Sequence, residues 1–310
     1  MKNKKNKLSK NNLNSVTLFA FNRPFHTFKT LESLTKNPEA IDTKIYIFVD
    51  GPRIYSEKKL IDSTIKVIDK FSGKFKEFNL NTSPINKGLA SSIYSGINKV
   101  FEKEDATIIL EDDIVTSKYF LDFMNKSLEI YRAEEKVWHI SGFNYPIKSN
   151  SFKEDSYLWR FMNCWGWATW RDRWESFMYN PLSIDPFYLI DIFDKKMIKD
   201  FNVSFMGENC WSQIIANAEG RLNTWAIFWY AHIFLNKGLC LNPIRNQILN
   251  IGLDGSGQNC GKYLQPNTNL DQSKRIINFP KNIEENKYVV KTIKQYMLKR
   301  KIFRALKKFI

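Results

Sequence analysis

Apolar and polar positions follow two different rhythms along the first half of the chain. Short runs of β-branched and aromatic residues, typical of buried strands, are separated by longer stretches in which apolar residues recur every three or four positions, as on one face of a helix. The strand-like runs cover residues 15–21, 44–51, 74–80, 106–112 and 137–142, and the helix-like stretches cover 26–36, 56–71, 87–102 and 117–132. This alternation predicts an α/β fold whose mostly parallel, twisted sheet is flanked by helices.

The second half of the chain loses this rhythm. Residues 146–285 show no regular strand–helix alternation, and every tryptophan except Trp138 lies there. We interpret this part as an extension of the same domain rather than as an independent fold. The predicted segments are a basic disordered tail (1–14), a ligand-binding half (15–145), the extension (146–285) and a C-terminal amphipathic helix (286–310).

Composition is that of a folded protein, because 43% of the 310 residues are hydrophobic. The longest strongly apolar stretch, residues 225–235, is too short to span a bilayer and contains His232. The lysines at the N-terminus are not followed by an apolar segment, so no secretory signal is predicted and we expect a cytoplasmic protein. The four cysteines are widely spaced, which predicts reduced thiols in or near the core rather than a disulfide framework or a zinc site.

The positive charge of the chain is concentrated at its two ends. The formal net charge is +15, of which five lysines lie in residues 1–10 and eight basic residues lie in 291–310, with no acid in either segment. The body between them is therefore close to neutral. A nucleic-acid-binding protein carries its basic stripe on the folded domain more often than on its ends, so we do not expect a nucleic-acid partner.

The C-terminal segment has the pattern of a basic amphipathic helix. Leu298, Ile302, Leu306 and Ile310 recur every four residues, and lysines and arginines occupy the other face. Such a helix lies on an anionic membrane surface, which would make the protein peripheral on the inner face of the cytoplasmic membrane. The alternative is a terminal helix docked on its own domain, with a solvated basic face.

Three consecutive acids, Glu111, Asp112 and Asp113, follow the apolar strand at 106–112. Like charges at the end of a buried strand repel one another unless a cation lies beside them. Oxygen ligands without a nearby His or Cys favour Mg²⁺ or Mn²⁺, which bind one or two carboxylates and leave positions for phosphates. The triplet therefore predicts a metal-bridged diphosphate site, and the alternative is a solvated acidic turn.

Other polar residues fall at the ends of neighbouring predicted strands. Asn22 and Arg23 follow the first strand, and Asp50 and Gly51 end the second. Because ligands bind at the carboxyl edge of such sheets, these residues should lie beside the acidic triplet.

Taken together, these stretches resemble the GT-A glycosyltransferases. The triplet resembles the Glu-Asp-Asp motif of the N-acetylglucosaminyltransferase I family, "FNRP" (21–24) is similar to its first-strand segment, and "VDGP" (49–52) to its second-strand segment. Residues 86–101 resemble its helix facing the nucleotide, and "CWGWATWRDRWESF" (164–177) resembles a Gly-Trp stretch of related bacterial sugar transferases. The resemblance covers about residues 15–260.

The resemblance implies a nucleotide-sugar donor and a Mn²⁺ or Mg²⁺ ion. It makes Asp113 the direct metal ligand, with Asp112 and Glu111 in support, and residues 146–285 the acceptor side. The residues placed at the nucleotide sugar are Phe21, Asn22, Arg23, Asp50, Lys87, Gly88, Glu111, Asp112, Trp165 and Gly166. Trp165 also suits carbohydrate by its own chemistry, because sugar faces pack on aromatic rings, whereas Trp167 and Trp170 are expected in the core.

An inverting transfer also needs a base for the acceptor hydroxyl, and the resemblance points to Glu208 in "FMGENCW" (205–211). A helix-capping role is the alternative for Glu208, and a retaining transfer would need no such base. His232, in its apolar run, is either a core imidazole or a second metal ligand. The glycine-rich segment 252–257 is either a loop that closes over the donor or a connecting turn.

The sequence thus predicts a metal-dependent glycosyltransferase. It would move a sugar from a nucleotide-sugar donor, a UDP-sugar, to a hydroxyl of a bacterial surface glycan or of a lipid-linked acceptor. A non-catalytic nucleotide-sugar-binding or membrane-surface-binding protein of the same fold is the alternative.

Overall fold

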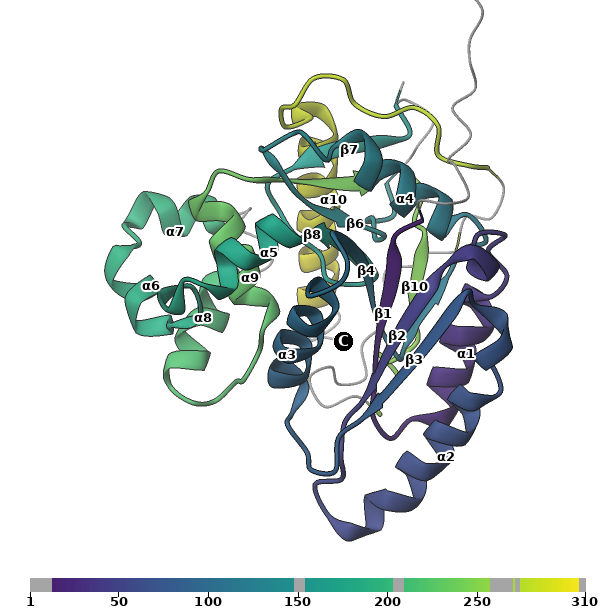
Figure 1. Ribbon diagram of the computed structural model, residues 1–310. Coiled ribbons are helices and arrows are strands. Elements are labelled where there is room, and N and C mark those ends of the chain that lie inside the picture. The colour runs from purple at the N-terminus through teal and green to yellow at the C-terminus, as the bar shows by residue number, and fades with distance from the viewer. Residues whose placement is uncertain (1–12, 148–153, 203–208, 257–269, 271–273, 307–310) are drawn as a thin grey trace, which may run out of the picture.

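A mixed sheet forms the centre of the protein in the computed structural model, which describes residues 13–147, 154–202, 209–256, 270 and 274–306. Within these residues eight strands follow the order β3-β2-β1-β4-β8-β6-β9-β7 (Figure 1). β8 and β7 run opposite to the other strands, which share one direction. This confirms the predicted α/β fold with a mostly parallel sheet flanked by helices. The strands are β1 (Ser15–Ala20), β2 (Lys44–Val49), β3 (Glu77–Thr82), β4 (Ala106–Glu111), β6 (Val137–Ser141), β7 (Ser156–Trp159), β8 (Trp167–Trp170) and β9 (Leu239–Pro243).

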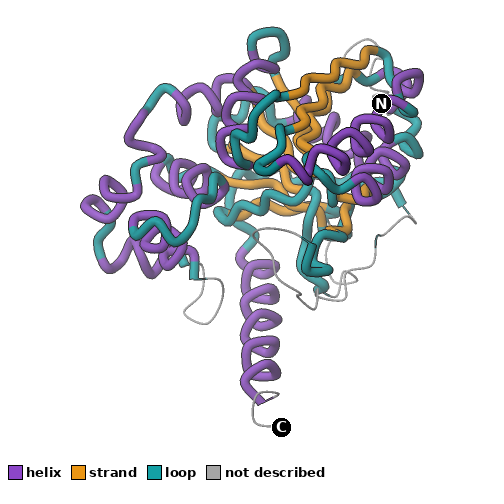
Figure 2. Tube along the Cα trace, turned by 90° about the horizontal axis from the view of Figure 1, so that it is seen from below, coloured by secondary structure: helices purple, strands orange, loops and turns teal. Residues whose placement is uncertain are grey.

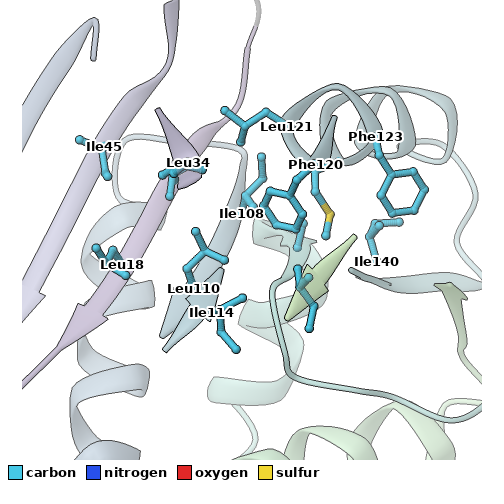
Figure 3. Packing of buried hydrophobic residues seen from close by; sticks show 14 of the residues in the cluster. Leu18, Leu34, Ile45, Ile108, Leu110, Ile114, Phe120, Leu121, Phe123 and Ile140 are labelled. Atoms are coloured by element: carbon cyan, nitrogen blue, oxygen red, sulfur yellow. The ribbon is translucent and has the colours of Figure 1, made fainter. Parts of the chain in front are cut away.

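The two faces of this sheet are covered by different helices. Side chains alternate along β1, so that Val16 and Leu18 point to one buried cluster and Phe19 points to the other. The first cluster is closed by α1 (Pro24–Leu34), α2 (Lys58–Asp69) and α4 (Phe120–Ile130), and part of it is drawn in Figure 3. The second is closed by α3 (Leu89–Phe101) and by elements of the second half of the chain.

The second half of the chain contributes both strands and a helical lobe. β8 lies between β4 and β6 and pairs antiparallel with both, so the two halves of the chain share one sheet. The lobe lies beside the sheet, at the left in Figure 1, and its core is aromatic, with Trp174, Phe177 and Trp229 fully buried. Its helices are α5 (Arg171–Met178), α6 (Pro186–Ile192), α7 (Lys195–Phe201), α8 (Cys210–Ala218) and α9 (Ala226–Leu235). Trp167 and Trp170 are buried, as expected. The boundaries of the four predicted segments stay predictions.

A small second sheet returns the chain to the end of β4. β5 (Ile114–Thr116) directly follows the acidic triplet and pairs antiparallel with β10 (Ile248–Asn250). The pairing places the residues after β10 beside Asp113, although the two segments are separated by more than a hundred residues in sequence.

The C-terminal helix α10 (Lys287–Leu306) is docked through its first half. Val289, Ile293 and Met297 follow one another at helical spacing and are buried against the second cluster. Ile302 is 52% exposed, and the last turns of the helix stand clear of the body (Figure 2). The alternative of a terminal helix docked on its own domain therefore holds for the first half of α10. The buried apolar positions begin at Val289, before the predicted stripe that begins at Leu298. Residues 307–310, including Ile310, lie outside the described part, and so does most of the basic tail 1–14. No helix in the part of the chain that the structure describes is long and apolar enough to cross a membrane.

Candidate active site

The acidic triplet is held at a fixed place on the carboxyl edge of the sheet. Leu110 immediately before it and Ile114 immediately after it are both buried, and both point into the first cluster (Figure 3). Two apolar anchors four residues apart leave the carboxylates of Glu111, Asp112 and Asp113 little choice of position. We call these three side chains the acidic corner.

Arg23, at the end of β1, lies between two members of the acidic corner. Its Nη2 pairs with the Asp112 carboxylate and lies 3.0 Å from Asp113 Oδ2. The backbone N–H of Phe21 also donates to Asp112 Oδ2 over 3.4 Å. Thr30 of α1 donates its hydroxyl to the Asp112 carbonyl over 2.8 Å, which fixes the backbone of the corner. The first strand and the acidic triplet therefore meet as predicted.

Two acids of the corner, Glu111 and Asp112, have raised pKa values. Burial, followed by the charges of Asp113 and Asp112, raises the pKa of Glu111 to about 8. Burial also raises the pKa of Asp112, against the opposing effect of the Arg23 charge. Burial disfavours the Arg23 cation, but the two aspartates outweigh it and raise the pKa of the guanidinium. Arg23 therefore does not offset the burial and mutual repulsion of these acids, and Glu111 keeps its proton at neutral pH.

The corner fits a hard divalent cation by its donor set. It offers carboxylate oxygens only, which suits Mg²⁺ or Mn²⁺, and Arg23 pairs with two of its three acids. Among the described residues no three His, Cys, Asp or Glu side chains are arranged to enclose an ion by themselves. A metal here would therefore take one or two ligands from the protein and the remainder from phosphate oxygens and water.

The segment after β10 packs directly against Asp113. Ile251 donates its N–H to the Asp113 carbonyl over 2.9 Å. A Cβ on Gly252 would clash with the Asp113 carboxylate and lie 3.0 Å from Arg23 Nη1, so only glycine fits. Further along, Asp254 Oδ2 lies 3.1 Å from His26 Nε2. Hydrogen bonds from Ser256, with the nearby His26, lower the pKa of Asp254 to about 2. The described part of the glycine-rich segment thus borders the acidic corner, and residue 257 lies beyond it.

A second polar cluster lies beside Phe21 and Asn22. Asn22 donates through Nδ2 to Glu57 Oε1 over 3.2 Å, and Arg53 donates through Nε to the same oxygen over 2.9 Å. The Arg53 guanidinium lies 5.2 Å from the centre of the Phe21 ring. Sequence reasoning missed Arg53 and Glu57, although the i,i+4 spacing of opposite charges directly after "VDGP" signals such a pair.

Asp50 binds the loop that follows β3. Its carboxylate accepts hydrogen bonds from the backbone N–H groups of Lys87 and Gly88, both at 2.9 Å, and from Asn86 Nδ2 at 3.0 Å. Gly88, with φ +77°, begins α3 in a conformation that favours glycine. Asp50 therefore positions residues 86–88 at the carboxyl edge, where the Lys87 side chain is exposed.

Gly166 packs beside Ile114, the residue that directly follows the acidic corner, and Trp165 precedes it in sequence. The Trp165 ring stands edge-on to Phe143, with centroids 5.0 Å apart. Gly166 has φ +59°, and a Cβ there would lie 3.3 Å from Ile114 and 2.9 Å from Ile248. This close packing brings Gly166, from the second half of the chain, next to the residue that follows the acidic corner, and the contact of Trp165 with a sugar stays a prediction.

The structure tests the interpretation of His232 but not that of Glu208. His232 lies in the helical lobe, with its ring nitrogens 3.1 Å from Ser176 Oγ and 3.0 Å from Ser183 Oγ, and it packs against Trp229. Of the two interpretations left open for His232, these contacts favour the core imidazole, because both ring nitrogens have partners within the lobe. Glu208 lies outside the described residues, so its role as a base stays a prediction.

The cysteines were predicted to lie in or near the core as reduced thiols. Cys210 and Cys240 are buried and Cys164 is partly buried, and no disulfide joins these three described cysteines. Cys260 lies outside the described residues.

Comparison with known proteins gives a distant structural likeness. No protein-family model matches the sequence, and no curated protein matches it. Among solved structures the fold is similar to mannosyltransferase PcManGT from Pyrobaculum calidifontis in complex with GDP-Man and Mn²⁺. The two share 10% identity with a TM-score of 0.38, over 74% of this chain and 70% of the other. At that TM-score the overlap is partial, so the function proposed next rests on the residues of this chain.

Proposed function

We propose that the protein is a metal-dependent glycosyltransferase that moves a sugar from a nucleotide-sugar donor, a UDP-sugar, to a hydroxyl group of a surface glycan or lipid-linked acceptor. The observation that carries the proposal is the acidic corner: three carboxylates at the carboxyl edge of the sheet, contacted by Arg23 and bordered by Gly252. Such an edge is where doubly wound sheets bind nucleotides, and the sheet is consistent with a GT-A-like arrangement.

Within this proposal Asp113 and Asp112 would hold Mn²⁺ or Mg²⁺. The ion, when bound, supplies Lewis-acid stabilisation of the charge that develops on the diphosphate. Arg23 places a fixed guanidinium at the same point and so adds a second positive charge directed at the phosphates. Lys87, exposed beside the loop that Asp50 holds, is a further cation for the donor. Trp165 offers an aromatic face to the sugar, and Glu208 is the proposed base of an inverting transfer.

The last turns of α10 are proposed to contact an anionic membrane surface. The supporting observations are the exposed Ile302, the projection of the helix beyond the body (Figure 2) and the concentration of basic residues in 291–310. A membrane contact would hold the protein close to a lipid-linked acceptor.

Replacing Asp113 by Ala tests the metal site. We expect Mn²⁺-dependent turnover of nucleotide sugars to fall at least about 100-fold, because the variant lacks the proposed metal ligand. A 100-fold loss corresponds to about 2.7 kcal/mol of transition-state stabilisation, at 1.36 kcal/mol for each factor of ten. The measurement is release of nucleotide from a panel of nucleotide sugars, alongside stabilisation of the protein by UDP with Mn²⁺.

The matched control is Asp105→Asn. Asp105 directly precedes β4, at the opposite end of the strand from the triplet, and its carboxylate forms surface ion pairs with Arg132 and Arg171. This variant should retain wild-type turnover. Near-normal rates in the Asp113→Ala protein would remove the metal role, and binding of UDP without turnover of any donor would identify a binding protein instead.

A further inference from the structure

Exposed apolar side chains gather where β2 and β3 end and α2 begins, at the bottom of Figure 1. Ile54 is 63% exposed, Tyr55 88% and Ile85 68%. Leu60, in the first turn of α2, is 47% exposed. Single exposed apolar side chains are common on protein surfaces, whereas several on neighbouring segments mark a contact site. We call these four side chains the apolar tip.

The two segments that carry the apolar tip are joined to each other. Asn86, from the connection after β3, donates through Nδ2 to the Gly51 carbonyl over 2.8 Å. A Cβ on Gly51 would lie 2.5 Å from the backbone of Ile85, so the two backbones touch at this point. The connection after β2 and the connection after β3 therefore form one surface.

The turn that carries Ile54 and Tyr55 is fixed by its own hydrogen bonds. The buried Glu57 carboxylate accepts a hydrogen bond from the Arg53 N–H over 2.9 Å and pairs with the Arg53 side chain. The Glu57 N–H donates in turn to the Ile54 carbonyl over 3.1 Å. The turn is thus closed on itself, so its two apolar side chains are presented without the cost of ordering a loose loop on binding.

The charges around the apolar tip are positive. Lys58 and Lys59 directly follow the turn, and both are exposed. Residues 51–61 and 83–88 contain a single acid, Glu57, which is buried and paired with Arg53. Apolar side chains beside exposed lysines, with no exposed acid in these two segments, fit a partner that is apolar beneath an anionic surface.

An anionic lipid bilayer has this chemistry. Its headgroup layer accepts lysines, whose apolar stems lie along the interface, and tyrosine rings, which have an apolar body and a polar end. Tyr55, at 88% exposure, stands out from the surface of the protein. A protein partner would need a pocket shaped to receive so exposed a side chain, whereas a bilayer deforms around it.

We propose that the apolar tip inserts into an anionic membrane surface and turns the carboxyl edge of the sheet toward the lipid. The acidic corner follows β4 at the same edge, so a lipid-linked acceptor would meet the donor at the membrane surface. The insertion rests on the residues of the tip, whereas its use for a lipid-linked acceptor rests on the proposed function and deepens it. The contact is additional to the one proposed for α10, and two weak contacts together hold a protein on a membrane better than either alone.

Vesicle binding tests the apolar tip directly. We would measure co-sedimentation of the full chain with phosphatidylserine-containing vesicles for the wild type and for a double variant that combines Ile54→Asp with Tyr55→Asp. The double variant should bind about tenfold more weakly, because two side chains that enter the bilayer are replaced by charges that anionic lipid repels. A second double variant, Lys58→Ala with Lys59→Ala, should also bind more weakly, because it lacks two charges that attract anionic lipid.

Matched controls lie at the opposite end of the same two strands. Ile41, 57% exposed, precedes β2, and the exposed Lys74 and Lys76 precede β3. Ile41→Asp, and Lys74→Ala combined with Lys76→Ala, should bind vesicles as the wild type does. Calorimetry should find wild-type affinity for UDP with Mn²⁺ in every variant, and thermal unfolding establishes that each chain is folded.

Three outcomes would overturn the inference. A wild-type chain that does not bind the vesicles, or one that binds them no better than the Ile54 and Tyr55 double variant does, removes the insertion. Weaker binding of UDP by that double variant assigns its two side chains to the donor site instead. A wild-type chain that binds vesicles through the tip but binds no nucleotide with Mn²⁺ would overturn the proposed function and leave the membrane contact in place.

Discussion

At the scale of single residues, the acidic corner depends on how closely the backbone of a distant segment approaches it. Gly252 presses against the Asp113 carboxylate and the Arg23 guanidinium, and any larger residue would displace one of them. The carboxylate that is proposed to bind metal is thus positioned by a residue that has no side chain of its own.

Gly252→Ala should therefore weaken the site more than it weakens the fold. The added methyl group must move Asp113 or the backbone of residues 251–253, so we expect binding of UDP with Mn²⁺ to fall about tenfold, or 1.4 kcal/mol. Calorimetry measures the affinity. Gly73→Ala is the control, because a Cβ there meets nothing within 4 Å. Equal affinities in the two alanine variants would show that the contact is not needed.

How far the site could be predicted differs from residue to residue. The acidic triplet and Arg23 meet as expected, because the carboxyl ends of parallel strands share one edge. Arg53 and Glu57 were missed because an i,i+4 pair in a polar segment looks like any solvated helix start. The role of His232 was left open because an apolar run does not reveal which core it enters, and only the fold shows that its partners belong to the helical lobe.

At the scale of elements, the first half of the chain could be predicted closely and the second half could not. The five expected strands appear as β1, β2, β3, β4 and β6, with small shifts such as 77–82 for the expected 74–80. β8 is only four residues long and joins the sheet between two strands of the first half. Nothing local in a run this short specifies its partners, since the pairing is made by distant residues.

The C-terminal helix gives an element-scale prediction. If the projecting half of α10 inserts apolar side chains into an anionic membrane surface, Ile302→Asp should lower binding to phosphatidylserine-containing vesicles about tenfold. The exposed isoleucine would be buried in the membrane on binding, whereas the aspartate is repelled by anionic lipid. Co-sedimentation with vesicles measures the effect, and pure phosphatidylcholine vesicles should bind the wild-type chain poorly.

Ile41→Asp provides the matched comparison. Ile41 is also exposed, at 57%, and lies in a different part of the molecule from α10. Loss of vesicle binding in both variants, or in neither, would argue against a specific contact by α10.

At the scale of the whole molecule, two buried histidines make stability depend on pH: His139 on β6 and His232 in the helical lobe. Two of the three histidines are buried as neutral rings. Burial lowers the pKa of His139 to about 3 and that of His232 to about 4. Between pH 4 and pH 6.5 the unfolded chain therefore binds more protons than the folded chain, so stability is complete above pH 6.5 and is lost as the pH falls.

Removing one imidazole should flatten this dependence. In the window from pH 6.5 to pH 4.5 each buried histidine lowers the free energy of unfolding by about 1.4 kcal/mol per pH unit. His232→Gln should be less stable than the wild type at pH 7, but its unfolding free energy should fall less steeply toward pH 4.5. Urea unfolding at several pH values measures both slopes, and parallel curves would contradict the assignment.

Arg23 has a consequence for the order of events at the acidic corner. The chain already carries a tethered counter-ion between Asp112 and Asp113, so the corner keeps its shape before any ligand arrives. A divalent ion arriving alone must compete with a charge that cannot diffuse away. Under the proposed function, a phosphate group arriving with the ion would offer the guanidinium a new partner, and metal and nucleotide would then enter as one exchange of partners rather than as two separate bindings.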